Sequence, residues 1–312
     1  MFENRFVVAL FMAVVALPLS GVLEGCHKVP YTGRKQVIIM PKAQESAMGA
    51  QAYTDLLSEE KVSSNKAWGD IVKRVGQRVA KVTGESSYDW QFKLLAAETV
   101  NAFCLPGGKV AFYEGIMPVC SNEAGVAVVM GHEIGHAIAR HGIKRMRQGI
   151  IVQLGALGVS VATQTKSEQE KLVLMGAYGA LANLGFVLPF SRKHETEADH
   201  IGIMYMALAG YDPAEAPRFW GRMAQSGSNV PAFMSTHPKS DKRAEDLDSL
   251  MADAKKVYNA AKKKYGTGVA VQGSTSGSKS STSGGSKESG SKDSGSSGST
   301  MPPKKDTSGK KK

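Results

Sequence analysis

The chain has 312 residues, and its 39 Lys and Arg against 28 Asp and Glu give a formal charge of +11. Of this excess, +5 lies in Gly266–Lys312, where eight Lys face three acidic residues. The rest of the chain has no stripe of basic and aromatic residues, which argues against a nucleic-acid partner. A hydrophobic fraction of 42% excludes collagenous, wholly disordered and disulfide-scaffold proteins.

The first 25 residues have the pattern of an export signal. Arg5 precedes an uncharged apolar run, Val7–Leu19, which is short for a membrane span. Cys26 follows this region directly, and Leu23-Glu24-Gly25-Cys26 resembles the lipobox of bacterial lipoproteins. That resemblance implies that Cys26 is lipidated and anchors the protein to a membrane. The alternative is an ordinary cleaved signal with an incidental cysteine, and in either case we expect export.

The other end of the chain, Gly266–Lys312, has 14 Ser and 10 Gly among 47 residues. Such a segment buries too little apolar surface to offset its ordering entropy, so we expect a disordered tail whose removal leaves folding intact. It is either a weakly basic tether to an anionic envelope polymer or membrane, or an inert extension.

Residues 27–265 should form one mainly α-helical α+β domain. Apolar residues at three- and four-residue spacing predict helices, and short apolar runs next to a Pro-Gly-Gly turn predict strands. The expected helical segments are Met40–Val82, Asn122–Gln148, Ile150–Thr163, Leu172–Phe190, Ser191–Ala209 and Asp241–Lys264. The expected strands are Trp90–Leu95 and Lys109–Tyr113, separated by the turn Pro106-Gly107-Gly108.

One of these helical segments approaches the length of a membrane span. Leu172–Phe190 has 19 residues without a charge, but Asn183, Pro189 and several glycines interrupt it. We therefore expect it to pair with Ile150–Thr163 in a buried helical hairpin. A membrane-dipping element is the alternative.

A metal-binding motif lies within the segment Asn122–Gln148. His132-Glu133-Ile134-Gly135-His136 places two imidazoles four residues apart, on one face of a helix, where both can bind one Zn²⁺. Glu133 lies beside the open coordination position and can take a proton from water. Because the bare motif also occurs by chance in unrelated helices, the assignment depends on a third ligand.

The third ligand is best supplied by Glu195 on the helix Ser191–Ala209. The metzincin pattern fails, since it needs Gly and His where this chain has Ala139 and Gly142. Asp199 lies one turn after Glu195 and can accept the free N–H of a zinc-bound imidazole. The other polar residues nearby are expected to have no part in the site: His141 at a helix end, Glu197 as a solvated carboxylate, and His194 and His200 beside less suitable positions.

These motifs, in this order, resemble the gluzincin family that includes HtpX, the Oma-type proteases and the CAAX prenyl proteases, and above all its exported bacterial lipoprotein branch. Four segments carry the resemblance: Val29–Arg34, Asn101–Gly108, the two metal helices, and Ser235-Thr236-His237-Pro238. It implies a zincin-like metalloprotease domain with a small β-sheet flanking the active-site cleft. It also implies one Zn²⁺ held by His132, His136 and Glu195, with Glu133 as catalytic base.

Two further assignments follow from the resemblance. The first is an edge strand that pairs with an extended substrate peptide by β-augmentation, formed by Asn101, Ala102, Phe103, Pro106, Gly107 and Gly108. The second places His237 and Arg243 at the zinc cleft, as catalytic residues. His237 then either stabilises the tetrahedral oxyanion or caps the metal in a closed state; the alternative is a loop residue held by Pro238.

Cys104 and Cys120 complete the set of possible reactive groups. In an oxidising compartment the two can pair, and Cys104 is equally suited to be a small core residue. Neither lies in a recognisable nucleophile motif, which disfavours a thiol protease.

The sequence thus predicts an exported zinc metalloendopeptidase of the bacterial cell envelope, on the periplasmic side and anchored to the outer membrane through Cys26. Its expected substrates are unfolded or misassembled envelope proteins, a class implied by the resemblance alone. The rival interpretation is a metal-bound chaperone or binding module that rarely cleaves.

Overall fold

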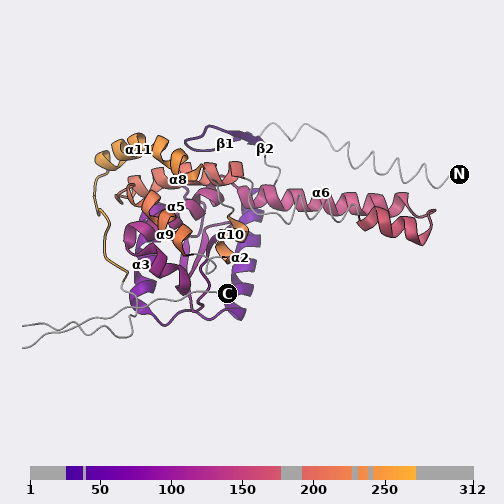
Figure 1. The fold of residues 1–312 in the computed structure, drawn as a ribbon, viewed down its shortest axis with the longest axis horizontal. Helices are drawn as coiled ribbons and strands as arrows, with labels where there is room; N and C mark the ends of the chain where they lie inside the picture. Colours follow the sequence, from indigo (N-terminus) through magenta and orange to yellow (C-terminus); the bar gives the residue numbers. More distant parts are fainter. Residues whose placement is uncertain (1–25, 38–39, 177–191, 227–230, 238–241, 272–312) are drawn as a thin grey trace, which may run out of the picture. The chain divides into compact units, whose positions relative to one another are not determined.

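The part of the chain that the computed structural model describes comprises residues 26–37, 40–176, 192–226, 231–237 and 242–271, and it is mostly helical with two small sheets (Figure 1). The expected α+β class is confirmed. The longer helices are α2 (Lys42–Glu59), α3 (Lys66–Val82), α5 (Glu123–Ile138), α6 (His141–Ala162), α8 (Arg192–Leu208), α9 (Glu215–Gln225) and α11 (Arg243–Ala260). The short ones are η2 (Glu114–Ile116), α4 (Met117–Cys120) and α10 (Pro231–Thr236).

The larger sheet has three strands in the order β3-β5-β4: β3 (Gln91–Leu95), β4 (Ala102–Leu105) and β5 (Lys109–Tyr113). β5 pairs parallel with β3 and antiparallel with β4. The predicted Pro-Gly-Gly turn lies between the two strands that the apolar runs predict, and it joins β5 to β4, the strand that the family resemblance places in Asn101–Gly108. Gly107 and Gly108 have φ of +78° and +85°, which a residue without Cβ adopts at little cost.

The centre of the domain is α5, all of whose residues are buried. It packs against α8, α3, β4 and α9. Val126, Ala127, Val129 and Met130 are at most 1% exposed, so the N-terminal half of α5 is anchored in the core. Asn122 caps the helix, its side-chain oxygen accepting a hydrogen bond from the Gly125 amide at 2.9 Å. The half of α5 that carries the motif His132–His136 therefore continues a helix whose N-terminal half is fixed in the core.

The predicted helix Asn122–Gln148 is broken in two. α5 ends at Ile138, and Arg140 adopts a left-handed conformation (φ +54°) before α6 begins at His141. The Arg140 guanidinium forms an ion pair with the buried Glu45 of α2 and donates to the Met40 carbonyl at 2.9 Å. These long-range contacts hold a conformation that a non-glycine residue rarely adopts.

The predicted segment Met40–Val82 is likewise two helices, α2 and α3. Between them, Val62 forms an isolated bridge to Leu95 at the end of β3. Asn65 caps α3 by accepting from the Trp68 amide. α3 then packs its apolar face on α5 and β3.

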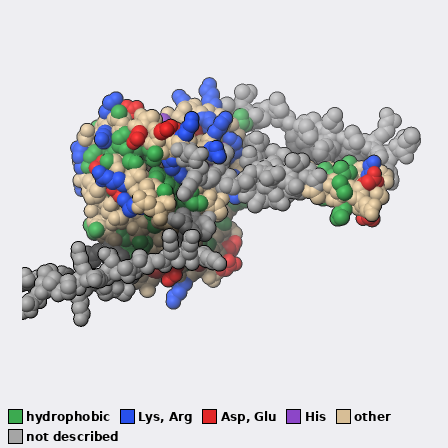
Figure 2. Space-filling model, in the orientation of Figure 1, with side chains coloured by type: hydrophobic (Ala, Val, Ile, Leu, Met, Phe, Trp, Pro, Cys, Tyr) green, Lys and Arg blue, Asp and Glu red, His purple; other side chains and the backbone are tan. Residues whose placement is uncertain are grey.

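The expected buried hairpin differs from the structure. α6 runs without interruption to Ala162, and residues 168–176 are helical. Leu172 and Val173 are 77% and 69% exposed, and Leu157 on α6 is 61% exposed, so the prediction that this pair is buried is wrong for the described residues; Figure 2 shows apolar side chains on its surface. The remainder of Leu172–Phe190 lies outside the described residues. In the described part of the chain, no helix has both the length and the hydrophobicity of a membrane span.

At the N-terminal end of the described chain, β1 (Cys26–Lys28) pairs antiparallel with β2 (Lys35–Val37) to form a hairpin. Met1–Gly25, the predicted signal, lies outside the described residues.

At the C-terminal end, the domain extends beyond the predicted boundary at residue 265. The amides of Glu123 and Ala124 donate to the carbonyls of Val269 and Thr267 at 2.9 and 3.0 Å, and Val271 is buried. Residues 266–271 thus hydrogen-bond to the first turn of α5, and the expected disordered tail cannot begin at Gly266.

Candidate active site

α5, α8 and the end of α10 bring four potential metal ligands together. The Nε2 atoms of His132 and His136 lie 3.1 Å apart, and Glu195 places one carboxylate oxygen 3.2 Å from Nε2 of His136 and the other 3.5 Å from Nε2 of His132. Nδ1 of His237 lies 3.2 Å from Nε2 of His132 and 3.3 Å from Glu195. One ligand atom from each of the four lies within 4.8 Å of the others, and all four residues are buried. We call these residues the metal cluster.

The charges around the metal cluster favour a cation. Burial lowers the pKa of His132, but Asp199 and Glu195 more than reverse this and raise it to about 10. Burial also opposes ionisation of Glu195, yet hydrogen bonds from His132, His136 and His237 hold the pKa of this carboxyl well below its usual range. A negative carboxylate thus faces imidazole nitrogens in a buried space, where one divalent ion would satisfy all of them.

The donor set fits zinc. Imidazole nitrogens and a carboxylate oxygen are ordinary Zn²⁺ ligands, and three or four converging ligands suit its tetrahedral preference. Oε1 of Glu133, which is buried, accepts no hydrogen bond from the described residues and lies 3.4 Å from Nε2 of His237. Such a polar atom is costly to bury unless a ligand, water or substrate uses it.

Asp199 lies where the sequence predicts it. Its Oδ1 is 2.8 Å from Nδ1 of His132, on the ring atom that faces away from the metal cluster. This contact fixes the tautomer of His132 and leaves Nε2 free for a metal.

Arg243 has a different place from the expected one. Its Nε donates to Oδ2 of Asp199 at 2.6 Å and its Nη2 to Oε2 of Glu195 at 2.9 Å, while the guanidinium lies 3.8 Å from the centre of the Trp220 ring. It therefore lies behind the two carboxylates instead of on the cleft wall. These contacts favour a positioning role for Arg243 over the expected catalytic role.

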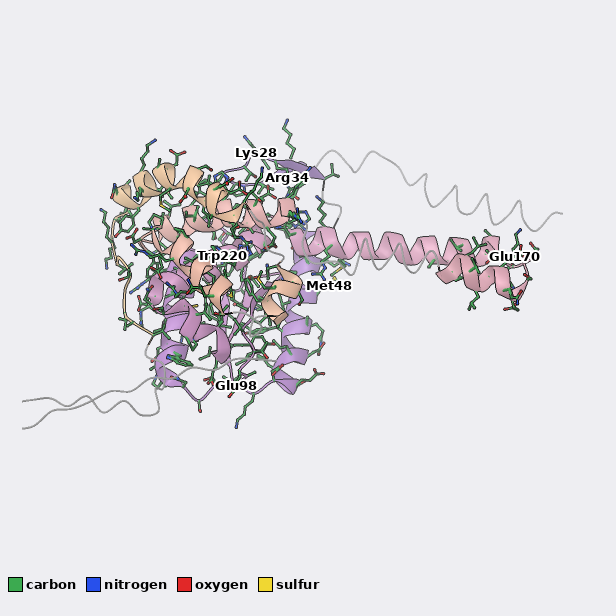
Figure 3. All side chains as sticks on the ribbon, viewed as in Figure 1. Lys28, Arg34, Met48, Glu98, Glu170 and Trp220 are labelled. Carbon is green, nitrogen blue, oxygen red and sulfur yellow. The ribbon has the colours of Figure 1, made fainter. Side chains whose placement is uncertain are left out.

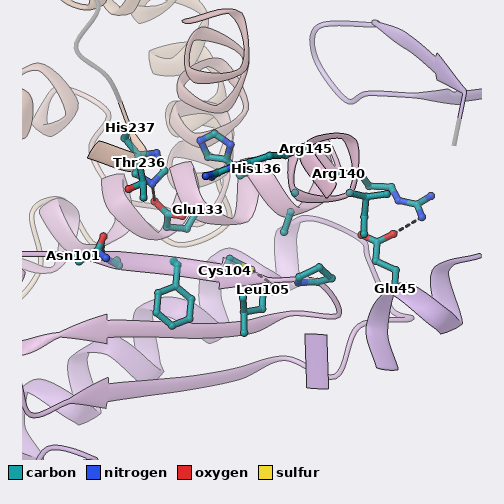
Figure 4. A pocket seen from close by; sticks show the side chains of 16 residues that line it. Glu45, Asn101, Cys104, Leu105, Glu133, His136, Arg140, Arg145, Thr236 and His237 are labelled. Carbon is teal, nitrogen blue, oxygen red and sulfur yellow. Dashed lines mark hydrogen bonds and ion pairs between the residues drawn. The ribbon is translucent and has the colours of Figure 1, made fainter. Parts of the chain in front are cut away.

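A cleft of about 260 Å³ opens beside the metal cluster (Figure 4). Glu133 and His136 of α5 form one wall, and β4 and its flanking residues form the other. Burial raises the pKa of Glu133 more than the imidazoles of His237 and His132 lower it, so this carboxylate is a stronger base than an exposed one. His237 and Thr236 also line the cleft, and the His237 ring stacks on Phe233 at 4.5 Å.

The predicted substrate strand divides into two parts. In the described chain β4 pairs on one side only, with β5, and it is the edge of its sheet. Asn101, Ala102, Phe103 and Pro106 line the cleft together with Cys104 and Leu105. Gly107 and Gly108 instead form the turn, where a Cβ on Gly107 would lie 2.9 Å from Cα of Ser46. The positive φ of the turn and the close neighbours around it explain why glycines occupy positions 107 and 108.

Two residues that were expected to lie outside the site contact it. Nδ1 of His141 lies 2.9 Å from Nδ1 of His136, and its Nε2 lies 2.8 Å from Oε2 of Glu197. His141 is at a helix end, as predicted, since α6 begins there, but it is fully buried and Glu197 is only 8% exposed. The predictions that His141 has no part in the site and that Glu197 is a solvated carboxylate are therefore wrong. Because the helix breaks at Arg140, the angle that a continuous helix would give His141 does not apply.

Burial and neighbouring groups shift the pKa values of both His141 and Glu197. Burial lowers the pKa of His141 more than Glu197 raises it, which favours a neutral ring. Burial raises the pKa of Glu197, but hydrogen bonds from His141, Arg34 and Thr32 outweigh it and hold the pKa well below its usual range. Arg34 and Thr32 lie in the segment Val29–Arg34 that carries part of the family resemblance, and this was the only sequence signal for the contact.

The cysteines and remaining histidines have no place among the ligands. Cys104 and Cys120 are free thiols, so the possible disulfide does not form. Cys120 is in the core, and Cys104 lines the cleft. His194 stacks on His141 at 4.3 Å and His200 lies near Tyr31, and neither belongs to the metal cluster.

Comparison with known proteins agrees with this geometry. The sequence model of peptidase family M48 matches residues 69–251. The mitochondrial metalloendopeptidase OMA1 of Schizosaccharomyces pombe is 36% identical over 237 residues, covering 72% of this chain and 66% of that protein. The β-barrel assembly-enhancing protease of Escherichia coli K12 is 28% identical over 230 residues, covering 72% of this chain and 47% of that protein. The chain thus spans about two thirds or less of the length of these curated relatives.

Proposed function

The chain belongs to peptidase family M48, and on that basis we propose that it is a zinc-dependent metalloendopeptidase with His132, His136 and Glu195 as metal ligands and Glu133 as catalytic base. The observation that carries this proposal is the position of Glu133. Its carboxylate lies between the metal cluster and a cleft bordered by an unpaired strand edge, and one oxygen has no hydrogen-bond donor among the described residues. A purely structural glutamate would not be buried in this way.

The chemistry follows from these positions. His132, His136 and Glu195 would hold the Zn²⁺, which would supply a lowered pKa for water and a polarised scissile carbonyl. Glu133, which lines the cleft, is placed to accept a proton from the attacking water and to pass it to the nitrogen of the leaving amine. The backbone of β4 pairs with an extended substrate by β-augmentation, which holds the scissile bond against α5 with little regard to side-chain identity. Asp199 and Arg243 hold His132 and Glu195 in place throughout.

The test is a comparison of wild type with Glu133→Gln on an unfolded protein substrate, with zinc measured in both. Gln keeps the size and polarity of Glu but cannot accept the proton, so zinc should stay stoichiometric while cleavage is lost. Cleavage at the wild-type rate by zinc-loaded Glu133→Gln would rule out Glu133 as the base.

The proposed setting is the bacterial cell envelope, with Cys26 as a lipid anchor and misassembled envelope proteins as substrates. The apolar run Val7–Leu19 followed by Cys26 supports export and anchoring. A relative in Escherichia coli is named as a β-barrel assembly-enhancing protease, which supports a role in envelope quality control, whereas the yeast relative is mitochondrial. Cys26→Ser should move the protein from the membrane to the soluble envelope fraction, and unchanged fractionation would contradict the lipid anchor. Trapping with Glu133→Gln would identify bound substrates.

A second candidate function is a latent, metal-bound binding module. The observation in its favour is that His237 lies within the metal cluster, where it would complete a closed four-ligand set. Substrate capture by zinc-loaded wild type without any proteolysis would favour this second function.

A further inference from the structure

A chain of polar contacts runs from the β1–β2 hairpin to His136. Nδ1 of His136 meets Nδ1 of His141 at 2.9 Å, and Nε2 of His141 meets Oε2 of Glu197 at 2.8 Å. Glu197 accepts from Nε of Arg34 at 2.9 Å and from the Thr32 hydroxyl at 2.6 Å, and Nη2 of Arg34 lies 2.7 Å from the same carboxylate. Figure 3 places Arg34 on the hairpin beside α8. Residues far apart in the sequence thus form one continuous path to a proposed ligand.

The direction of these hydrogen bonds is set by the metal cluster. Nε2 of His136 faces His132 and Glu195, so a metal there requires Nε2 to carry no proton. The proton of His136 is then on Nδ1, which donates to Nδ1 of His141. His141 in turn must carry its own proton on Nε2, and it donates that proton to Glu197. A neutral His141 can accept on one nitrogen and donate on the other, and the carboxylate of Glu197 is the acceptor that lies on the far side.

The two metal-binding histidines are therefore supported differently. His132 donates directly to a carboxylate, Asp199, which Arg243 holds. His136 reaches its carboxylate, Glu197, through an intervening imidazole, and Arg34 holds that carboxylate. In both cases an arginine-paired carboxylate ends the path, and the second path leaves the helical core for the hairpin.

We propose that His141 and Glu197 are positioning residues that fix the tautomer and ring orientation of His136, and that the β1–β2 hairpin strengthens zinc binding by holding Glu197 through Arg34. This rests on the proposed role of His136 as a zinc ligand. Partners of this kind raise ligand basicity, and their loss weakens metal binding by roughly 10–100-fold.

The central experiment measures zinc affinity of the full chain by competition with a chelator, for His141→Phe and His141→Gln. Phe keeps a ring that can stack on His194, but it neither accepts from His136 nor donates to Glu197. Gln restores both functions through its amide. Zinc affinity should fall by roughly 10–100-fold in His141→Phe and recover in His141→Gln. Wild-type affinity in His141→Phe, or equal losses in both variants, would overturn the proposal.

The hairpin is tested by Arg34→Ala against Lys35→Ala. Both remove one positive charge from the hairpin, but the exposed Lys35 makes no contact with Glu197, so it is a matched control. Arg34→Ala should weaken zinc binding by up to about tenfold, the low end of the range for such partners, while Lys35→Ala leaves it unchanged. Equal affinities in the two variants would overturn the part played by the hairpin. Because Arg34 is partly exposed, its variant keeps the test open if His141→Phe does not fold.

Two further measurements separate this inference from the proposed function. Nitrogen-15 spectra of the zinc-loaded wild type should show His141 neutral and protonated on Nε2, and the opposite tautomer would overturn the proposal. His136→Ala should lose zinc. If it keeps zinc, the ligand assignment itself fails; if it loses zinc while His141→Phe retains full affinity, only the positioning role fails.

Discussion

Gly131 of α5 and Gly202 of α8 face each other where the two helices that carry the metal cluster cross. A Cβ on Gly202 would lie 2.8 Å from the backbone nitrogen of His132, and one on Gly131 would lie 2.6 Å from the carbonyl oxygen of Gly202. A Cβ on Gly135, one turn later, would lie 2.9 Å from the carbonyl oxygen of Ala198. Because these glycines have no side chains, α5 and α8 can approach each other closely. This close approach brings Glu195 within reach of both imidazoles.

We expect Gly202→Ala to force α5 and α8 apart. Backbone atoms, which cannot rotate away, occupy the space of the new methyl group, so the cost should be about 1–3 kcal/mol of unfolding free energy. Zinc affinity should fall as well, because Glu195 moves with α8. Thermal unfolding and chelator competition measure the two effects. Gly221→Ala on α9 is the control: a Cβ there meets nothing within 4 Å, and it should be neutral or stabilising by about 0.5–1 kcal/mol. Unchanged zinc affinity in Gly202→Ala would show that the crossing distance does not control the site.

The ligand assignment gives a second prediction. His132→Ala and Glu195→Ala should each lose stoichiometric zinc, since each removes a ligand from a buried set. Asp199→Asn should keep zinc but bind it roughly 10–100-fold more weakly, because an amide is a poorer acceptor for Nδ1 of His132. Zinc content by elemental analysis and affinity by chelator competition distinguish these outcomes. Stoichiometric zinc in Glu195→Ala would transfer the role of third ligand to His237, the remaining member of the metal cluster.

The sequence predicts the spacing of the candidate ligands within each helix because these signals are local. His132, Glu133 and His136 depend only on helical spacing, and Glu195 and Asp199 depend on the same spacing in a second helix. The distance between those two helices could not be read from periodicity, although the glycines that set it are visible in the sequence once α5 and α8 are known to cross.

The features that the sequence does not predict depend on contacts between distant residues. The break at Arg140 carries no Gly or Pro, and it is held by an ion pair with Glu45. His141 and Glu197 reach the site only because of that break and of Arg34, more than 160 positions before Glu197. The parallel pairing of β3 with β5 is equally non-local, because β4 lies between them in the sequence although not in the sheet. A helical wheel drawn through the break gives His141 the wrong direction.

The C-terminal segment 266–271 gives a third prediction. Residues 266–271 supply carbonyls to the first amides of α5, which a helix cannot satisfy internally. A chain ending at Tyr265 should therefore lose stability relative to one ending at Gly273, by about 1–3 kcal/mol for a buried donor left unpaired. Denaturant unfolding of the two truncated chains measures the difference. Because α5 carries the metal cluster, the shorter chain should also bind zinc less tightly. Equal stability of the two chains would show that water replaces these carbonyls without cost.

The last prediction concerns His237, whose two expected roles have opposite consequences. Its Nδ1 lies 3.2 Å from Nε2 of His132 and 3.3 Å from Oε1 of Glu195, so it occupies the space of a fourth ligand. Its Nε2 lies 3.4 Å from the carboxylate of Glu133, so the ring also lies beside the proposed base. This geometry favours the capping role, in which we expect substrate to displace His237 before hydrolysis.

His237→Ala should then raise the cleavage rate of a short unstructured peptide, or cause self-cleavage, while zinc is retained on the other three ligands. If His237 instead stabilises the oxyanion, the same change should lower turnover by roughly 10²–10³-fold. Thr236→Ala is the matched control, since Thr236 lines the same cleft but, among the described residues, its hydroxyl bonds only to backbone carbonyls of α10. The ratio of turnover in His237→Ala to that in Thr236→Ala therefore exceeds one for a cap and falls far below one for an oxyanion donor. A ratio of one would leave His237 as a loop residue that happens to pack on Phe233.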